Sequence, residues 1–196
     1  MSEFLDIPIG TIATVVTTLE MRALPPPDEP ALARRDVEMR RVERPDLAWY
    51  RALFRAVGER WLWFSRLRLE DDALAAILHD PAVEVYALQD KEREIGLLEL
   101  DFRDAGAVEL AFLGVVPEII GSGAGRFLMA QAMERVRRQD GPVRFWVHTC
   151  TLDHPRAVEF YVRAGFTPIR RQVEITADPR LDGTLPRDCA PGVPLI

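Results

Sequence analysis

Three glycines at alternate positions, Gly121, Gly123 and Gly125, stand between an apolar run and a pattern typical of a helix. Glycine allows positive φ angles and lets the backbone approach a ligand closely. The first N–H groups of a helix have no partner within it, and the helix dipole favours a negative charge there. These residues predict an anion site to which Arg126 can add a charge. The structural alternative is a plain strand-to-helix turn, which needs one glycine at most.

Two common nucleotide motifs do not fit this stretch. A P-loop needs Lys and then Ser or Thr after its last glycine, where this chain has Arg126 and Phe127. A dinucleotide fingerprint needs glycine at position 126 and a repeated βαβ unit, and the sequence indicates neither. The remaining interpretation is a pyrophosphate held by backbone amides at a helix N-terminus, without a metal.

The elements around the glycines indicate a mixed α/β sheet. Hydrophobic periodicity predicts strands over 11–24, 36–42, 83–90, 94–102, 107–116, 141–149 and 166–176, with a hairpin joining 83–90 to 94–102. It predicts helices over 44–67, 70–78 and 154–165. A further helix follows the glycines, and its apolar face is formed by Leu128, Met129, Ala132, Met133 and Val136. We expect the Pro- and Gly-rich end of the chain to lie extended over the surface.

Composition narrows the class of protein. The chain has 196 residues, 48% of them hydrophobic and 29% charged, which is typical of a soluble globular domain. The net charge of −6 argues against nucleic acid or an anionic membrane as partner. We find no long uncharged apolar run and no basic region ahead of an apolar N-terminal segment, so a cytoplasmic location is expected. Cys150 and Cys189 form neither a disulfide framework nor a metal spacing.

Two motifs together resemble the GNAT superfamily of acyl-CoA-dependent N-acyltransferases. The family's loop pattern, Gln/Arg-x-x-Gly-x-Gly/Ala, aligns with residues 120–125, and its later Tyr-bearing helix that ends in Gly-Phe aligns with Tyr161, Gly165 and Phe166. The resemblance covers most of residues 36–176. One departure is Ile120, where the family usually has Gln or Arg, although backbone donors do most of the phosphate binding.

The resemblance implies a fold and a division of the chain. The fold is α/β (α+β), a mixed, mostly antiparallel twisted sheet of about six or seven strands flanked by helices, with an extra N-terminal strand. The expected parts are an N-terminal strand and Pro-rich linker over 1–30, the acyltransferase domain over 31–176 and an extended tail over 177–196. The extra strand and the tail are candidates for joining a homodimer, because an added edge strand can join two sheets.

Transfer of an acyl group from a thioester to an amine needs a base, because a free primary amine is mostly protonated at neutral pH. Glu109 is the first candidate, since it stands among apolar residues on the strand that feeds the loop and partial burial would raise its pKa. Some members of the family carry a basic glutamate at the matching place. Glu99 is the reserve, and the alternative for Glu109 is a solvent-exposed or arginine-paired side chain.

The remaining roles follow from the resemblance. The Tyr161 hydroxyl would protonate the leaving thiolate, with a core aromatic as the alternative. The backbone of 113–116 would pair with the pantetheine arm of acetyl-CoA, and the N–H of Gly114 or Val115 would hold the carbonyl oxygen. The implied cofactor-binding residues are Leu113, Gly114, Val115, Val116, Gly121, Ser122, Gly123, Ala124, Gly125, Arg126 and His154.

Other residues carry weaker signals. His154 can stand in for a cofactor-binding Asn of the family, and for both His148 and His154 a capping or supporting role competes with a metal or triad role. Asp153 is a candidate N-cap for the helix that follows. Cys150 is a small buried residue or, less simply, a nucleophile. Trp61, Trp63 and Phe64 wall the acceptor pocket or belong to the core, and Arg66 and Arg68 meet an acceptor carboxylate or are merely exposed.

We therefore expect an acetyl-CoA-dependent N-acetyltransferase that acts on a primary amine of a small molecule or peptide, by direct attack in a ternary complex. No metal is expected. The alternative from another class is a non-catalytic module that binds or senses acyl-CoA, which Ile120 favours. Transfer to a hydroxyl would keep the same loop.

Overall fold

The computed structural model describes residues 4–26, 37–91, 93–139 and 144–196. The strands are β1 (Thr11–Met21), β2 (Val37–Arg41), β3 (Val83–Asp90), β4 (Arg93–Asp101), β5 (Ala107–Val115), β6 (Arg144–Cys150) and β7 (Thr167–Ala177). The helices are α1 (Leu47–Gly58), α2 (Asp71–Leu78), α3 (Ala124–Arg137) and α4 (Ala157–Arg163), with short 3-10 turns η1 (Glu59–Trp61) and η2 (Pro117–Ile119). Of the helices in these ranges, none has both the length and the hydropathy that crossing a bilayer requires.

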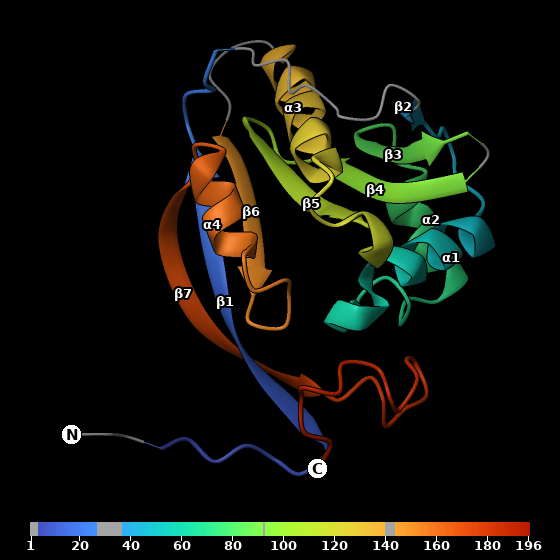
Figure 1. Cartoon of the computed structure of the whole chain (residues 1–196), viewed down its shortest axis with the longest axis vertical. Coiled ribbons are helices and arrows are strands. Elements are labelled where there is room, and N and C mark those ends of the chain that lie inside the picture. Colours follow the sequence, from blue (N-terminus) through green and yellow to red (C-terminus); the bar gives the residue numbers. More distant parts are fainter. Residues whose placement is uncertain (1–3, 27–36, 92, 140–143) are drawn as a thin grey trace.

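The strands form one sheet with the order β2-β3-β4-β5-β6-β1-β7 among the described residues (Figure 1). Five of the neighbouring pairs are antiparallel, including the β3–β4 hairpin, and β5 pairs with β6 in parallel. The predicted fold class, a mixed and mostly antiparallel sheet flanked by helices, is confirmed.

β1 lies inside the sheet, although it comes first in the sequence. It pairs with β6 on one side and with β7 on the other. The expectation that this segment adds an edge strand that joins a second copy is therefore wrong, because residues 16–20 are paired with a strand on both sides. Among the described residues, β2 and β7 form the edges of the sheet. The expected boundary between residues 30 and 31 falls outside the described residues.

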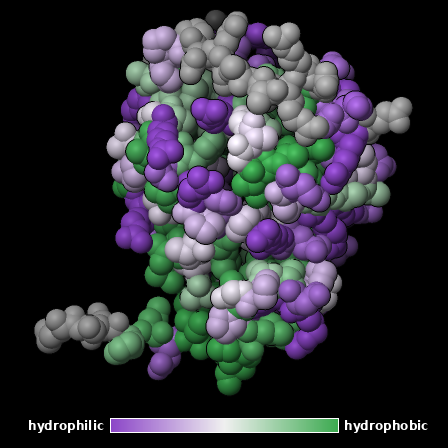
Figure 2. All heavy atoms as spheres, viewed as in Figure 1, coloured by the Kyte–Doolittle hydropathy of each residue, from purple (hydrophilic) through white to green (hydrophobic). Residues whose placement is uncertain are grey.

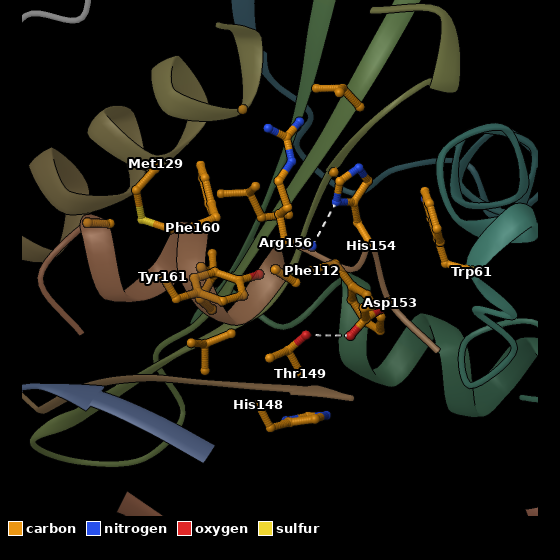
Figure 3. A pocket seen from close by; sticks show the side chains of 18 of the residues that line it. Trp61, Phe112, Met129, His148, Thr149, Asp153, His154, Arg156, Phe160 and Tyr161 are labelled. Atoms are coloured by element: carbon orange, nitrogen blue, oxygen red, sulfur yellow. Dashed lines mark hydrogen bonds between the residues drawn. The ribbon is translucent and has the colours of Figure 1, made fainter. Parts of the chain in front are cut away.

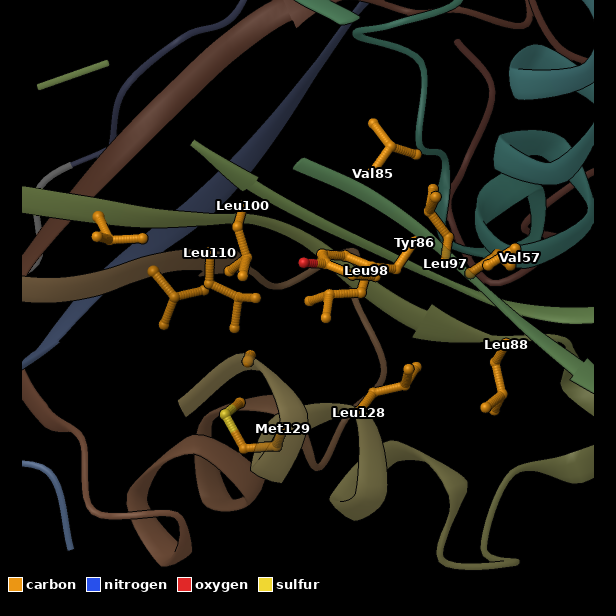
Figure 4. Packing of buried hydrophobic residues seen from close by; sticks show 14 of the residues in the cluster. Val57, Val85, Tyr86, Leu88, Leu97, Leu98, Leu100, Leu110, Leu128 and Met129 are labelled. Atoms are coloured by element: carbon orange, nitrogen blue, oxygen red, sulfur yellow. The ribbon is translucent and has the colours of Figure 1, made fainter. Parts of the chain in front are cut away.

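Two helices cover each face of the sheet, because side chains alternate along the strands and give both faces apolar residues to bury. Leu98, Leu100 and Leu110 point toward Leu128 and Met129 of α3, as Figure 4 shows. Residues between them point the opposite way, because successive side chains of a strand alternate. The face that receives α1 and α2 is called the α1 side below, and the face that receives α3 and α4 the α3 side. The predicted apolar face of α3 is buried as expected.

α1 begins at Leu47, three residues after the predicted start, and ends earlier than predicted. The Asp46 side chain accepts the N–H of Trp49 and so caps the first turn. The expected helix over 44–67 stops at Gly58, because Leu62 turns into the left-handed region and Trp63 donates its N–H back to Gly58. The Trp63 ring then lies 2.4 Å from where a Cβ of Gly58 would stand. A glycine at this point therefore lets the chain fold back on itself.

The end of the chain folds into turns rather than lying extended. Arg180 and Asp178 form a buried ion pair of 2.7 Å, and Arg180 also donates to the carbonyl oxygens of Val193 and Pro194. These bonds draw the last residues back toward β7. Figure 2 shows hydrophobic atoms gathered at this end of the molecule. The exposed large hydrophobic residues near the two ends of the described chain include Phe4, Leu5, Ile7, Ile9, Leu181 and Ile196.

Candidate functional site

A large cavity opens where β5 and β6 separate. The two strands pair over Ala107–Glu109 and Arg144–Trp146 and then diverge. A bulge in β5 lies at this point, because Leu110 faces Leu100 while Phe112 faces Glu99; a bulge bends its strand. The cavity has a volume of about 1440 Å³. Pockets for one drug-sized ligand span roughly 300–1,000 Å³, so this cavity has room for two reactants.

The far part of β5 offers an unpaired backbone edge to the cavity. Leu113, Gly114 and Val115 pair with β4 on one side and have no strand partner on the other among the described residues. All three line the cavity. Alternate N–H and C=O groups of such an edge are free to bind a ligand as an added strand would. Val116 differs, because its side chain is buried and its N–H donates to Ile95.

The glycine loop forms one end of this cavity. Gly121 and Gly123 have φ angles of +89° and +94°, which L side chains rarely adopt, and Gly125 does not need a positive φ. Ser122 Oγ accepts the N–H of Ala124, and the N–H of Phe127 begins the helical ladder. Within the part of the chain described, the amides of Gly123, Gly125 and Arg126 have no acceptor. The exposed Arg126 lies beside them, so the start of α3 fits an anion.

Tyr161 is buried, and it lines the cavity from α4 on the α3 side. Figure 3 shows its hydroxyl pointing into the cavity between Phe160 and Thr149. No hydrogen-bond partner of this hydroxyl occurs among the described residues, whereas the hydroxyls of Tyr50 and Tyr86 each donate to a carboxylate. Burial, with the nearby Asp153 charge, raises the pKa of Tyr161. The hydroxyl therefore keeps its proton at neutral pH, and it can donate a hydrogen bond into the cavity.

Glu109 lies on the α1 side of β5, one step outside the cavity. Its Oε1 is 3.3 Å from Nδ1 of His148, a β6 residue that does line the cavity. The bond to Glu109 is the main reason that the pKa of His148 lies above its ordinary value of 6.5. The predicted base, Glu109, thus contacts a histidine that lines the cavity but does not line the cavity itself.

Glu99 is held in a buried polar cluster rather than at the cavity. It is fully buried, and it accepts bonds from the Tyr50 hydroxyl and from Arg66 Nη2, the latter at 2.6 Å. Arg66 also lies 5.0 Å above the Phe112 ring. Both carboxylate oxygens of Glu99 are therefore occupied, and Arg66 binds this side chain instead of an acceptor carboxylate.

His154 and Cys150 line the cavity in supporting positions. His154 Nδ1 accepts the N–H of Arg156 at 3.1 Å, and the imidazole contacts Trp61 edge to face (Figure 3). Burial and the charges of Arg156 and Arg60 lower the pKa of His154, so it is neutral. Burial raises the pKa of the Cys150 thiol, which opposes a nucleophilic role.

The predicted aromatic cluster forms a wall of the cavity. Trp61, Trp63 and Phe64 all line it, and Trp63 packs against Phe54 and Phe112. The cluster is thus both wall and core. Arg68 lies over the Phe64 ring and binds Asp182 at 2.6 Å, so it ties the C-terminal residues to this wall.

Asp153 has a role that sequence reasoning missed. It was expected to cap α4, which instead begins after Arg156. Its Oδ2 accepts bonds from the Thr149 hydroxyl and the Cys150 N–H, and its Oδ1 accepts the indole N–H of Trp63. Trp63 is 90 residues away from Asp153 in the sequence, so no local pattern could have shown the bond between them.

Comparisons with known proteins agree with this geometry. Residues 47–166 match the model of the Acetyltransferase (GNAT) family. A GCN5-related N-acetyltransferase from Sphaerobacter thermophilus superposes with a TM-score of 0.59 at 19% identity, covering 84% of this chain and 51% of that one. A putative GNAT acetyltransferase from Novosphingobium aromaticivorans gives a TM-score of 0.53 at 18% identity, covering 89% and 69%.

A third structure is an aminoglycoside acetyltransferase, meta-AAC0020, from an uncultured soil metagenomic sample. It gives a TM-score of 0.54 at 15% identity and covers 66% of this chain and 88% of that one. At these identities the likeness concerns the fold. This chain spans 63% of a functionally unknown protein from Staphylococcus epidermidis and about half of the Sphaerobacter chain. A search of curated proteins gives no significant match.

Proposed function

The chain belongs to the GNAT acetyltransferase family, and on that premise we propose that it transfers an acetyl group from acetyl-CoA to a primary amine. The acceptor is a small molecule or a peptide, and attack is direct, with both reactants bound in the cavity. The observation that carries this proposal is that one cavity, where β5 and β6 separate, is lined by two groups suited to move protons. One is the Tyr161 hydroxyl, and the other is His148, which contacts Glu109.

Binding of the cofactor is supported by two features of the cavity. The free amides at Gly123, Gly125 and Arg126 suit a pyrophosphate, which needs several donors and no side-chain cation. The unpaired edge of Leu113–Val115 suits the amide-bearing pantetheine arm, because it can exchange hydrogen bonds with it. Ile120 also lines the cavity. It supplies no polar contact, so the backbone must carry the phosphate interaction.

The chemistry is then divided between the two faces of the sheet. On the α1 side, the Glu109–His148 pair accepts the proton that the amine must lose before it can attack. An N–H of the β5 edge, at Gly114 or Val115, polarises the thioester carbonyl. On the α3 side, Tyr161 donates a proton to the leaving thiolate. Acetyl-CoA supplies the activated acyl group.

The acceptor lies, in this proposal, on the α1 side between the aromatic wall and β6. Trp61 and Phe64 provide apolar surface, and Glu174 of β7 lines the same cavity. A cavity lined by both a carboxylate and apolar rings favours an amine that carries positive charge next to an apolar body.

A turnover assay tests the proposal. The purified chain is incubated with acetyl-CoA and a panel of amines that includes 2-phenylethylamine, spermidine, a lysine peptide and sisomicin. We expect amine-dependent release of the CoA thiol and an acetylated product by mass spectrometry. Binding of acetyl-CoA without turnover of any amine would favour the second candidate, a non-catalytic acyl-CoA-binding module, to which the apolar Ile120 in place of the usual polar residue points. An acetylated hydroxyl would move the activity to O-acyl transfer.

A further inference from the structure

Glu109 and His148 differ in their access to the cavity. His148 lines the cavity and more than half of its side chain is exposed, at 52%, while Glu109 is 24% exposed and does not line it. The pair exists because the parallel register sets Glu109 beside Trp146, and His148 is the next residue of β6 on the same face. A proton that leaves an amine in the cavity therefore meets His148 first.

The geometry also assigns the two ring nitrogens of His148. Nδ1 is the atom that lies 3.3 Å from Glu109 Oε1. A neutral imidazole carries one N–H, and the carboxylate favours that N–H on Nδ1 because it is an acceptor only. Nε2 then keeps its lone pair and is the atom available to a ligand. The same division of roles lets a carboxylate hold a histidine base in the correct tautomer in serine hydrolases.

The charges that raise the pKa of His148 come from three carboxylates, while Arg170 of β7 stands farther away, across β1, where it pairs with Thr18. Glu109 comes from β5, Asp153 from the segment after β6, and Glu174 from β7. The residue opposite His148 on β1 is Thr18, which is uncharged. Glu109 makes the largest contribution to the raised pKa of His148, and burial opposes it. A histidine that titrates above 6.5 is suited to accept a proton at neutral pH.

We propose that His148 Nε2 is the atom that takes the proton from the acceptor amine, and that Glu109 is a positioning residue that acts through it. This inference rests on the proposed function. The ammonium group of the acceptor gives one proton to Nε2. The amine nitrogen forms the new C–N bond with the acyl carbon as the C–S bond breaks, and the sulfur takes a proton from Tyr161. The nitrogen, now in the amide, releases its second proton, which restores Tyr161 through solvent, and His148 returns its own to solvent.

The test compares the pH dependence of kcat, at saturating amine and acetyl-CoA, in the wild type and three variants. His148→Gln should lower kcat about 100-fold, the lower end of the range for a general base, and should lose the acidic limb of the profile. Glu109→Gln should keep that limb and move it to lower pH, because the group that raises the pKa of His148 is gone. His79→Gln is the matched control; His79 Nε2 bonds to the carbonyl of Pro45 and does not line the cavity.

A proton NMR titration of the imidazole signals gives a readout that does not need turnover. The chain has three histidines, so the signal lost in His148→Gln identifies its resonance. We expect its pKa to lie above that of His154 and to fall in Glu109→Gln, while the chemical shift of the His79 signal at a fixed pH is unchanged.

Two results would overturn the inference in different ways. If His148→Gln keeps the acidic limb and Glu109→Gln loses it, the carboxylate itself is the base while the proposed function stands. If the wild type binds acetyl-CoA but acetylates no acceptor, the proposed function fails and the inference fails with it. An unchanged kcat in His148→Gln would also refute the role of His148.

Discussion

Trp63 donates its indole N–H to Asp153 Oδ1 over 2.9 Å, and this bond joins the segment after α1 to the segment between β6 and α4. The ring is fixed from the other side by β5, because a Cβ at Gly114 would lie 3.0 Å from it. Both residues line the cavity. The aromatic wall is therefore held to β5 and, through Asp153, to the end of β6. These contacts fix the distance between the two diverging strands.

The first prediction concerns this anchor. Trp63→Phe keeps a ring against Gly58 and Gly114 but removes the donor, which leaves the Asp153 carboxylate without one of its three partners. Hydrogen bonds to charged groups contribute about 1.5–3 kcal/mol, so we expect a loss of that size in the free energy of unfolding measured with urea. Trp146→Phe is the control, since no hydrogen bond of the Trp146 indole occurs in the described residues. Equal losses in both variants would show that the anchor has no special role.

The second prediction separates Tyr161 from the other two tyrosines. Tyr161→Phe should lower kcat about 100-fold and leave acetyl-CoA affinity and stability nearly unchanged, because its hydroxyl has no partner within the described residues. Tyr86→Phe should lower the free energy of unfolding and leave kcat nearly unchanged, since its hydroxyl bonds to Glu84 at 2.6 Å. Steady-state kinetics and urea unfolding of both variants check this. A large loss of affinity or stability in Tyr161→Phe would mark that hydroxyl as structural.

The third prediction is that Glu99 supports the fold rather than the chemistry. Removing one partner of a buried ion pair costs about 3–5 kcal/mol, because the other charge stays buried and uncompensated. Glu99→Ala should therefore lower the free energy of unfolding by this amount, while Glu38→Ala, on the exposed edge strand β2, should change it by less than about 0.5 kcal/mol. A Glu99→Ala protein of normal stability without activity would return Glu99 to the catalytic candidates.

Much of the site's framework could be predicted from the sequence, because it is local. Glycine spacing marks the turn into α3, and helical periodicity marks its buried face. The place of β1 could not be predicted in this way. A strand's own pattern of β-branched residues shows which face is buried but not which strands flank it, and Val16 meets Cys150 on one side and Gln172 on the other.

The contact between Glu109 and His148 could not be predicted from the sequence for the same reason. Each residue was singled out separately, as a base and as a supporting residue. Their contact depends on the parallel register of β5 and β6, and on the point at which those strands part. That register is set by tertiary packing rather than by either segment alone. The division of roles within the pair follows from access to the cavity, which only a structure displays.

The fourth prediction concerns pH and the end of the chain. The ion pair with Arg180 lowers the pKa of Asp178, so its contribution to stability is complete above the unfolded value of about 3.9 and is lost as the pH falls through the lower folded value. Asp178→Asn should cost about 3–5 kcal/mol at pH 7, and the difference from wild type should shrink below pH of about 4. Urea unfolding at several pH values measures this.

The control for that experiment is Asp182→Asn, whose partially exposed pair with Arg68 should contribute no more than about 1 kcal/mol. A difference between wild type and Asp178→Asn that stays constant down to pH 2 would contradict the prediction.

The central claim, that the glycine loop holds the phosphates of acetyl-CoA, is tested most directly by calorimetric titration of the wild type, Gly123→Asp and Gly106→Asp. Both glycines have positive φ, at +94° and +80°, so both variants carry similar backbone strain, but only Gly123 stands at the start of α3. We predict micromolar binding of acetyl-CoA, without binding of ATP or NAD, to the wild type and Gly106→Asp, and at least about tenfold weaker binding to Gly123→Asp, since a carboxylate would oppose the anion. Wild-type affinity in Gly123→Asp, or a folded wild type that binds no acetyl-CoA, would contradict the claim.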